Sequence, residues 1–291
     1  MIRTVAPAKI NLTLEVLGKR EDGFHEIRSV MQTISIVDEV TLTPSDSLTL
    51  EVEGAHEASD DDLVLRAVRT MEETHGLTAR GALRLLKRIP ASAGLGGGSS
   101  DASAAIRLVD SLHGLDEPAD GQAAVAARFS SDGPFFCYGG TAGVSGRGEI
   151  VEPLPDVPEF WVVVVTPPLE IVNKTRAMYG ALEGGDITDG SRTDRVTARI
   201  QGGERVRGED LQNAFDRAAV ETFDGLEGYR ERLKDAGAET VHLAGSGPAL
   251  FALVGSKTEA RAIRARLDAP GCLVQVARSF GAAEATAVDS A

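Results

Sequence analysis

A glycine-rich run stands between a predicted strand at 83–90 and helical spacing of apolar residues at 102–112. Glycine lets a ligand approach the backbone closely, and the first amides of a helix lack an internal acceptor and favour an anion. We expect Ser99 and Ser100 to cap the helix with their hydroxyls. The run predicts a phosphate-binding loop, and a flexible turn that only caps a helix is the alternative. Its residues are Ala91, Ser92, Ala93, Gly94, Leu95, Gly96, Gly97, Gly98, Ser99, Ser100 and Asp101.

Two familiar phosphate loops do not fit this run. A P-loop has Gly-Lys followed by Ser or Thr, and no lysine follows these glycines. A dinucleotide-binding loop has a third glycine where Ser99 stands, and it usually opens the first strand–helix unit of its domain. The interpretation therefore depends on the glycine content and the helix start.

Two charged residues outside the run are of types that act on phosphates. Lys9 and Asn11 share one face of a predicted strand at 5–17, opposite its apolar face. Lys9 is either a solvent-facing residue of an edge strand or a fixed cation aimed at a negative ligand. Asp132 precedes Gly-Pro and two phenylalanines. It forms either an acidic turn or cap, or a carboxylate at the edge of an apolar pocket that accepts a proton.

An aromatic residue and a histidine, Phe24 and His25, directly follow the turn signal at 21–23. A single histidine after a turn is often an ordinary surface residue. The pair also has the groups needed to bind a base, because the phenyl ring can stack and the imidazole can hydrogen-bond to the base edge.

Composition limits the classes of partner. The 291 residues carry a net charge of −14, which disfavours a nucleic-acid partner. The two cysteines, Cys137 and Cys272, form no Cys-x-x-Cys pattern and suggest neither zinc nor a disulfide. We find no signal-peptide pattern and no apolar run long enough to span a bilayer. We therefore expect a cytoplasmic protein without a membrane partner.

Patterning predicts two halves that meet near residue 155, at a proline-rich segment. In the first half we expect a hairpin from strands at 5–17 and 24–36 and a second hairpin at 40–52. Helices should follow at 60–75 and 119–129, and a strand, glycine turn and strand at 138–148.

The second half reads as an α+β unit. We expect strands at 160–166 and 273–277, a strand pair from 240–244 and 249–254, and a frayed tail at 282–291. A long surface loop, with at most one helical turn, should occupy 183–208. Helices are expected at 174–182, 210–223, 229–236 and 258–267.

Three stretches together resemble the motifs of a known family. They are 6–12 (APAKINL), the glycine run, and 243–249 (LAGSGPA), and their order and spacing are similar to those of the GHMP kinases, which include galactokinase, homoserine kinase and mevalonate kinase. The match covers nearly the whole chain. Segments 20–26 (REDGFHE) and 131–136 (SDGPFF) resemble the members that phosphorylate a cytidine-diphosphate-linked polyol in non-mevalonate isoprenoid synthesis.

The resemblance implies an α+β fold with two domains, 1–155 and 156–291. The first would be an α/β domain like the second domain of a small-subunit ribosomal protein, and the second would be ferredoxin-like. The substrate would lie in the cleft between them. The family acts with ATP and Mg²⁺, whose ligands the resemblance leaves unknown. We expect a small-molecule kinase that is a monomer or weak homodimer.

The resemblance also implies roles for individual residues. Lys9 and Asp132 match the catalytic pair, and the amides of 91–101 would bind the ATP phosphates. On the substrate side the matching residues are Asn11, Phe24, His25, Gly245, Ser246 and Gly247, with His25 reading the cytosine edge, Phe24 stacking on the ring, and the last three shaping the floor of the site.

Some positions depart from the family pattern. Phe24 stands where tyrosine is usual, and Gly133 stands where valine is usual, so we expect a looser backbone around Asp132. No second aromatic for the base is evident at 169–172. Other substrates, such as homoserine or mevalonate, and a nucleotide-binding protein without catalysis, are the alternatives.

Overall fold

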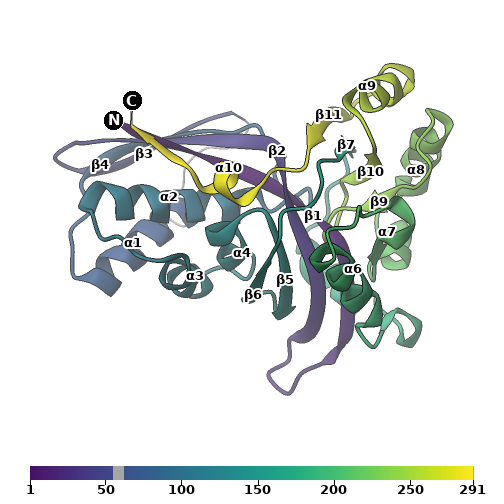
Figure 1. Cartoon of the computed structure of the whole chain (residues 1–291), viewed down its shortest axis with the longest axis horizontal. Helices are drawn as coiled ribbons and strands as arrows, with labels where there is room; N and C mark the ends of the chain where they lie inside the picture. The colour runs from purple at the N-terminus through teal and green to yellow at the C-terminus, as the bar shows by residue number, and fades with distance from the viewer. Residues whose placement is uncertain (55–61, 291) are drawn as a thin grey trace.

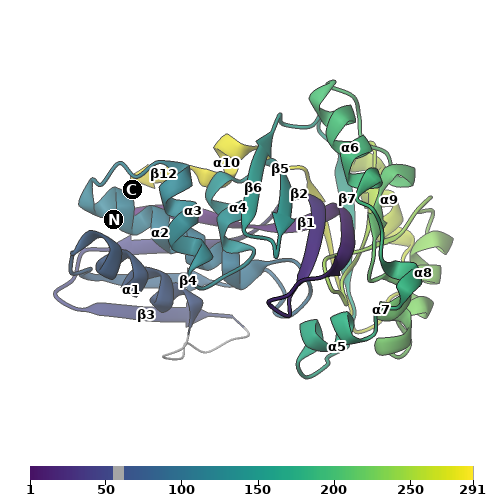
Figure 2. The same cartoon turned by 90° about the horizontal axis from the view of Figure 1, so that it is seen from below.

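The computed structural model describes residues 1–54 and 62–290, which form two sheets with helices packed beside them (Figures 1 and 2). The first sheet runs β12-β1-β2-β4-β3, with β5 paired to β2, β6 to β5, and β8 to β1. Its strands are β1 (Ile2–Lys19), β2 (His25–Thr43), β3 (Leu48–Glu53), β4 (Gly81–Leu86), β5 (Thr141–Gly146), β6 (Ile150–Leu154), β8 (Gln212–Asn213) and β12 (Val288–Ser290).

The long hairpin of β1 and β2 is the central element of the fold, and it confirms the first predicted hairpin. The Asp22 carboxylate accepts the Phe24 backbone N–H at 3.1 Å and closes the turn. Register shifts, such as the one between Asn11 and Thr13, bend the pair as it passes from the first sheet toward the second half of the chain (Figure 1). On its other side β1 pairs with β12 at residues 2–4 and with β8 at residues 13–14, and between them the Lys9 N–H donates to Leu95 of the glycine run, so Lys9 does not face solvent at a sheet edge.

The second predicted hairpin, at 40–52, is wrong. β4 lies between β2 and β3, and β3 pairs with β4 in parallel. Parallel neighbours need a crossover connection, and helix α1 (Leu63–His75) follows β3 and precedes β4. The turn residues at 44–46 therefore join two strands that are not neighbours.

Helices α1, α2 (Gly97–His113), α3 (Ala119–Ala127) and α4 (Gly133–Tyr138) gather beside the first sheet (Figures 1 and 2). Asp62 caps α1 by accepting the Val64 N–H at 2.8 Å, while positions 60 and 61 of the predicted helix lie outside the described residues. The strand–turn–strand expected at 138–148 is misplaced, because α4 extends to Tyr138 and the turn follows β5.

The second sheet runs β11-β7-β10-β9 with every pair antiparallel, which confirms the predicted α+β class. Its strands are β7 (Trp161–Thr166), β9 (His242–Leu243), β10 (Leu250–Val254) and β11 (Leu273–Arg278), and the predicted strand pair across 240–254 is confirmed. Helices α5 (Lys174–Gly180), α7 (Asp216–Thr222), α8 (Leu226–Asp235) and α9 (Lys257–Arg266) accompany it.

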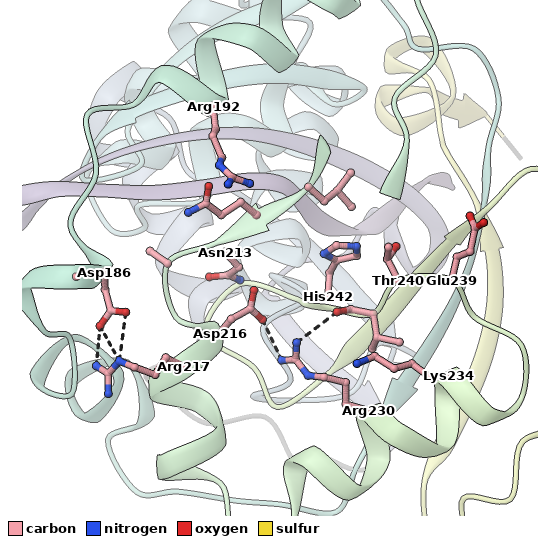
Figure 3. A pocket seen from close by; sticks show the side chains of 15 residues that line it. Asp186, Arg192, Asn213, Asp216, Arg217, Arg230, Lys234, Glu239, Thr240 and His242 are labelled. Carbon is pink, nitrogen blue, oxygen red and sulfur yellow. Dashed lines mark hydrogen bonds and ion pairs between the residues drawn. The ribbon is translucent and has the colours of Figure 1, made fainter. Parts of the chain in front are cut away.

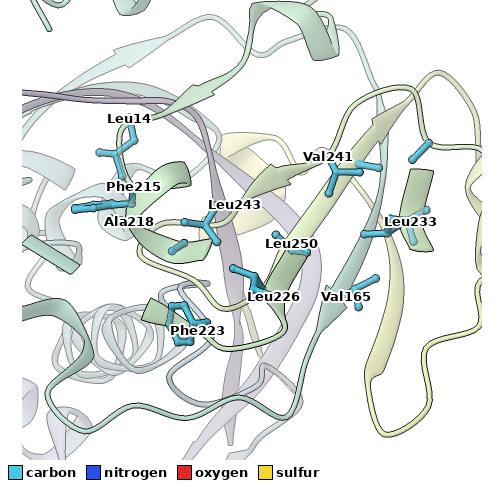
Figure 4. Close-up of a cluster of buried hydrophobic side chains, with 14 of the residues drawn as sticks. Leu14, Val165, Phe215, Ala218, Phe223, Leu226, Leu233, Val241, Leu243 and Leu250 are labelled. Carbon is cyan, nitrogen blue, oxygen red and sulfur yellow. The ribbon is translucent and has the colours of Figure 1, made fainter. Parts of the chain in front are cut away.

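One apolar cluster joins the two parts of the chain (Figure 4). Leu14 of β1 packs in the same cluster as Phe215, Leu243 and Val165, which belong to the second half. The hairpin and the second sheet therefore share a core, so the residues of β1 are held firmly against those of β9 and the turn that follows it.

Three expectations for the second half are wrong. The loop expected at 183–208 contains α6 (Ser191–Gln201), whose buried Thr193, Val196 and Ile200 have helical spacing in a polar segment. The helix expected from 210 begins only at Asp216, because β8 pairs with β1. The tail is not frayed: α10 (Ala282–Thr286) precedes β12, which pairs with β1.

The domain boundary near residue 155 stays a prediction. β12, at the far end of the second half, lies in the first sheet. Within the described residues, no helix is long and apolar enough to cross a bilayer.

Candidate active site

Lys9 is buried and fixed in β1. Only 4% of it is exposed, and its ammonium donates a hydrogen bond to the Asn11 side-chain oxygen at 2.7 Å. The Asn11 amide in turn donates to the Ser29 hydroxyl at 2.8 Å. The Lys9 backbone N–H donates to the Leu95 carbonyl of the glycine run at 2.9 Å. The Lys9 ammonium is thus oriented through Asn11 by Ser29 of β2, while the Lys9 backbone is bonded to the predicted phosphate loop.

Asp132 lies at the start of α4 and faces Lys9. Its carboxylate is 3.8 Å from the Lys9 ammonium, and about a third of its side chain is exposed. It makes no capping bond to the helix; the Ser130 hydroxyl instead accepts the Gly133 N–H at 3.0 Å. The acidic-cap alternative is therefore wrong, and the carboxylate is left free to face a ligand.

Close packing around position 133 explains why glycine stands there. A Cβ at this position would lie 3.0 Å from the Ala126 Cβ and 3.1 Å from the Ser130 Cβ, which is tighter than ordinary contact. Its carbonyl accepts a bond from the Ser103 hydroxyl at 2.9 Å. Because both of its backbone groups are bonded, the looser backbone expected around Asp132 is absent.

The glycine run lies directly against the third motif. A Cβ on Gly94, whose φ is +87°, would lie 2.0 Å from the Ala244 carbonyl oxygen. A Cβ on Gly96 would lie 2.7 Å from the Phe136 ring and 3.1 Å from the Lys9 Cγ. The Ala249 N–H also donates to the Ala93 carbonyl at 3.1 Å. These glycines are therefore required by close approach, which the flexible-turn alternative does not explain.

The helix start differs from the sequence expectation. Gly96, in the left-handed conformation, occupies the N-cap position of α2, and neither Ser99 nor Ser100 caps it. The Ser99 hydroxyl accepts a bond from Ser130 at 2.8 Å, whereas the buried Ser100 hydroxyl has no partner among the described residues. The predicted caps are therefore wrong, and the uncapped first amides of α2 remain available.

Gly245 of the third motif borders Lys9, one of the two predicted catalytic residues. A Cβ there would lie 3.0 Å from the Lys9 ammonium nitrogen and 2.8 Å from the Gly94 carbonyl oxygen. The buried Asn213 side chain donates to the Leu243 and Gly245 carbonyls at 3.0 and 2.7 Å. Sequence reasoning missed Asn213, because its segment was expected to be helical. Ser246 is half-buried and Gly247 is buried in the same turn.

His25 reaches the site through an unexpected aromatic neighbour. Its imidazole stacks on Tyr179 of α5, with ring centroids 4.6 Å apart and planes 17° from parallel. Burial, and then the Asp132 charge, raise the pKa of Tyr179 to about 12. Tyr179 therefore lies close to both His25 and Asp132. The segment 169–172 has no aromatic residue, and the aromatic neighbour of His25 comes from α5 instead.

Phe24 lies farther out. Half of it is exposed, and the Arg147 guanidinium lies 4.7 Å from the ring centroid. Burial, and then the charge of Lys19, lower the pKa of His25. The imidazole is therefore neutral at pH 7, with one donor and one acceptor nitrogen.

A group of buried charged side chains joins the segments on the two sides of the glycine run. The Lys87 ammonium contacts the Asp38 carboxylate and, at 2.5 Å, the Asp101 carboxylate. Asp38 also accepts the backbone N–H groups of Arg88 and Ile89. Burial raises the pKa of Asp101, and Lys87 offsets this only in part. The group fixes the strand end to the first turn of α2.

Lys174, the first residue of α5, also escaped the sequence analysis. Its ammonium donates to the Ser92 carbonyl at 2.7 Å and to the Gly247 carbonyl at 2.5 Å. Burial, and then the charge of Lys9, lower the pKa of Lys174 to about 8, while Asp132 acts in the opposite direction. Nothing local in the sequence marks this residue, because its partners come from two distant loops.

A separate cavity of about 600 Å³ lies beside β8, whose Asn213 is one of the residues that line it (Figure 3). Its principal charges are already paired, Arg217 with Asp186 and Arg230 with Asp216. None of the predicted catalytic or phosphate-binding residues lines it. The convergence of Lys9, Asp132 and the glycine run therefore marks the candidate active site better than this cavity.

Comparison with known proteins shows the family of this chain. Residues 62–140 match the GHMP kinases N terminal domain, and residues 203–271 match the GHMP kinases C terminal domain. A 4-diphosphocytidyl-2-C-methyl-D-erythritol kinase from Dehalococcoides mccartyi is 37% identical over 282 residues, which cover 97% of this chain and 99% of the relative. This chain belongs to the family of 4-diphosphocytidyl-2-C-methyl-D-erythritol kinases.

Solved structures extend the comparison. A crystal structure of 4-(cytidine 5'-diphospho)-2C-methyl-D-erythritol kinase aligns with a TM-score of 0.78 at 30% identity, covering 96% of this kinase and all of that chain. A homoserine kinase from Cytophaga hutchinsonii aligns with a TM-score of 0.71 at 20% identity, covering 97% of this kinase and 94% of that chain. The second likeness shows the fold alone. The predicted GHMP kinase fold and small-molecule kinase class are thus confirmed.

Proposed function

We propose that this kinase transfers the terminal phosphoryl group of ATP to the 2-hydroxyl of 4-diphosphocytidyl-2-C-methyl-D-erythritol. The products are the 2-phosphate and ADP, within non-mevalonate isoprenoid synthesis. The observation that carries the proposal is the Lys9–Asp132 pair, 3.8 Å apart and directly beside Gly96. We expect the enzyme to act on small molecules in the cytoplasm, as a monomer or weak homodimer.

Asp132 and Lys9 act on the acceptor alcohol. Phosphoryl transfer depends mainly on positioning and on neutralising charge. The substrate oxygen attacks the terminal phosphorus, the bond to the bridging oxygen of ADP breaks, and Asp132 orients the hydroxyl and accepts its proton. Lys9 keeps Asp132 ionised and neutralises charge on the transferring group. Asn11, which is buried against Lys9, holds that cation in place.

The glycine run binds the donor. Amides of 91–101 and the uncapped start of α2 face the phosphates, and Gly245 to Gly247 form the floor beneath them. Mg²⁺, when bound, neutralises phosphate charge. The residues from 1 to 54 and from 62 to 290 contain no cluster of three acidic, His or Cys side chains for a metal. Mg²⁺ would bind together with the ATP phosphates, and single oxygens of this chain would complete its ligands. The unpartnered Ser100 hydroxyl and Asp101 carboxylate oxygen are the candidates.

The cytidine end of the acceptor binds at the tip of the β1–β2 hairpin. Neutral His25 offers a donor and an acceptor to the cytosine edge, which suits the amino group and ring nitrogen of that base. Phe24 supplies a ring for stacking. Tyr179, which stacks on His25, belongs to the same helix as Lys174, so α5 connects this end of the site with the glycine run.

An ATP-consumption assay tests the proposal when it is run in parallel on the cytidyl substrate, homoserine and mevalonate. We expect turnover with the cytidyl substrate and at most a few per cent of it with the others. Comparable or greater turnover with homoserine or mevalonate would reject the assignment of the acceptor. Absence of ATP consumption with all three would reject the kinase.

A further inference from the structure

Lys174 joins the two loops that form the phosphate site. Its ammonium bonds to the Ser92 carbonyl at the start of the glycine run and to the Gly247 carbonyl in the third motif. The loops are otherwise in direct backbone contact at Gly94 and Ala244. α5, which Lys174 begins, also carries Tyr179, so the helix contacts both the donor and the acceptor ends of the proposed site.

The charges around Lys174 do not balance. The Lys9 and Lys174 ammonium groups border the same turn, since a Cβ on Gly245 would lie 3.0 Å from the Lys9 nitrogen and Lys174 donates to the Gly247 carbonyl, whereas the carboxylate of Asp132 lies 3.8 Å from Lys9. Among the described residues, no carboxylate lies within ion-pair distance of Lys174. A half-buried cation whose recorded partners are neutral carbonyls lacks a compensating negative charge. In a chain of net charge −14, this excess of positive charge is a local feature suited to an anion.

The ammonium also has unused bonding capacity. A lysine ammonium has three N–H donors, and the described residues accept two of them. The third donor, together with the neighbouring charge of Lys9, suits a phosphate oxygen better than a further carbonyl. Its neighbours on the site side are Lys9 and Asp132, the groups that act on the terminal phosphoryl group in the proposed function.

We propose that Lys174 is a second phosphate-binding cation of this kinase, which contacts the terminal phosphate of ATP while holding the Ser92 and Gly247 carbonyls together. The inference rests on the proposed function, because it needs ATP in the glycine cradle. It assigns to α5 a role in recognising the triphosphate and distinguishing it from the diphosphate product. Lys9 then acts on the Asp132 carboxylate and the acceptor side of the terminal phosphoryl group, and Lys174 neutralises charge on the oxygens of that same group.

Nucleotide binding separates this role from a purely structural one. Calorimetric titrations with ADP and with the non-hydrolysable analogue AMP-PNP, each with Mg²⁺, compare the wild type, Lys174→Met and Lys174→Arg. We expect Lys174→Met to weaken AMP-PNP roughly 10–100-fold, the range for a bond to a charged group, and ADP severalfold at most. Equal weakening of both nucleotides, or none, would overturn the proposal, since a distorted loop would affect both.

The pH dependence gives a second readout, which holds even if Lys174→Met fails to fold. Since the pKa of Lys174 is lowered to about 8, wild-type affinity for AMP-PNP should fall as pH rises from 7 to 9.5. Lys174→Arg stays charged, so its affinity should keep a flatter profile. Identical profiles in the two proteins would contradict the role.

Lys234→Met is the matched control, because this exposed lysine of α8 lines the separate cavity (Figure 3) and not the proposed phosphate site. It should bind both nucleotides like the wild type. Wild-type turnover is measured in the same preparations. A wild type that binds neither nucleotide would reject the proposed function itself. A wild type that turns over normally while Lys174→Met binds AMP-PNP equally well would reject only the inference about Lys174.

Discussion

The Lys9 side chain faces Asp132 at 3.8 Å, while its backbone N–H donates to the Leu95 carbonyl of the glycine run at 2.9 Å. One residue of β1 thus connects the proposed catalytic carboxylate with the proposed phosphate loop. The position of the Lys9 ammonium should therefore control transfer more than it controls the binding of either substrate alone.

Asn11→Leu tests how the cation is held. The change removes the oxygen that accepts the Lys9 bond at 2.7 Å and keeps a side chain of similar size. We expect kcat to fall about tenfold or more, because a misplaced catalytic group costs rate more than binding. KM for ATP should change less than threefold in the same steady-state measurements. A large rise in KM with unchanged kcat would instead place Asn11 in substrate binding, as the sequence resemblance implied.

His25→Ala tests recognition of the acceptor. Because the imidazole is neutral and stacks on Tyr179, its loss removes bonds to the base and leaves the phosphate loop intact. We expect KM for the cytidyl substrate to rise at least tenfold, which corresponds to about 1.4 kcal/mol, with KM for ATP nearly constant. His113→Ala, on the exposed end of α2, is the control. Equal effects on both substrates would contradict a base-reading role.

Gly94→Ala tests the close approach of the two loops. The new Cβ would lie 2.0 Å from the Ala244 carbonyl oxygen, so the loops must separate. We expect ATP affinity to fall at least tenfold and the melting temperature to drop. Gly203→Ala is the matched control, because its φ is also positive but its Cβ would meet nothing within 4 Å. The backbone conformation alone costs about 1 kcal/mol in either variant. The amount by which the loss in Gly94→Ala exceeds the loss in Gly203→Ala therefore measures the cost of the contact with Ala244. Equal losses would contradict the close-approach argument.

His242 predicts a loss of stability in acid. Burial, and then Arg230, lower the pKa of this histidine to about 4, compared with about 6.5 in an unfolded chain. Between these values the unfolded chain binds the proton and the folded chain does not, so the free energy of unfolding falls as pH falls from 6.5 toward 4. By pH 4.5 the loss from this group is about 2–3 kcal/mol.

Denaturant unfolding at pH 7 and pH 4.5 measures this effect. His242→Gln should lose less unfolding free energy between the two pH values than the wild type does. The exposed His113→Gln should behave like the wild type. An identical pH dependence in His242→Gln and the wild type would show that His242 takes up its proton equally in both states.

The sequence analysis predicted those parts of the site that have local signals. The glycine run, the unusual lysine at position 9 and the aspartate before Gly-Pro each differ from their surroundings within a few residues. The β1–β2 hairpin was predictable because its turn and alternation are contiguous. Even there, the analysis could not distinguish a buried Lys9 from an exposed one, because Lys9 is covered by the glycine run and by Gly245, which lie far along the chain from it.

The remaining parts depend on contacts between distant segments. Lys174 and Asn213 donate hydrogen bonds to backbone carbonyls that lie elsewhere in the sequence. Lys87 likewise pairs with the side chain of Asp101 beyond the glycine run. The order of β2, β4 and β3 depends on the crossover through α1, which the turn residues at 44–46 do not reveal. The analysis missed α6 because only three of its residues are buried and the rest of the segment is polar.

Asp132→Asn provides the most direct test of the central claim, since it removes the carboxylate charge and keeps the shape. A single-turnover experiment would mix saturating enzyme with labelled ATP and the cytidyl substrate and follow formation of the 2-phosphate, with nucleotide affinity measured separately. Asp235→Asn, at the exposed end of α8, is the control. We predict a rate at least about a hundredfold lower in Asp132→Asn, with AMP-PNP affinity within a few fold of the wild type. A transfer rate equal to that of the wild type would contradict the account.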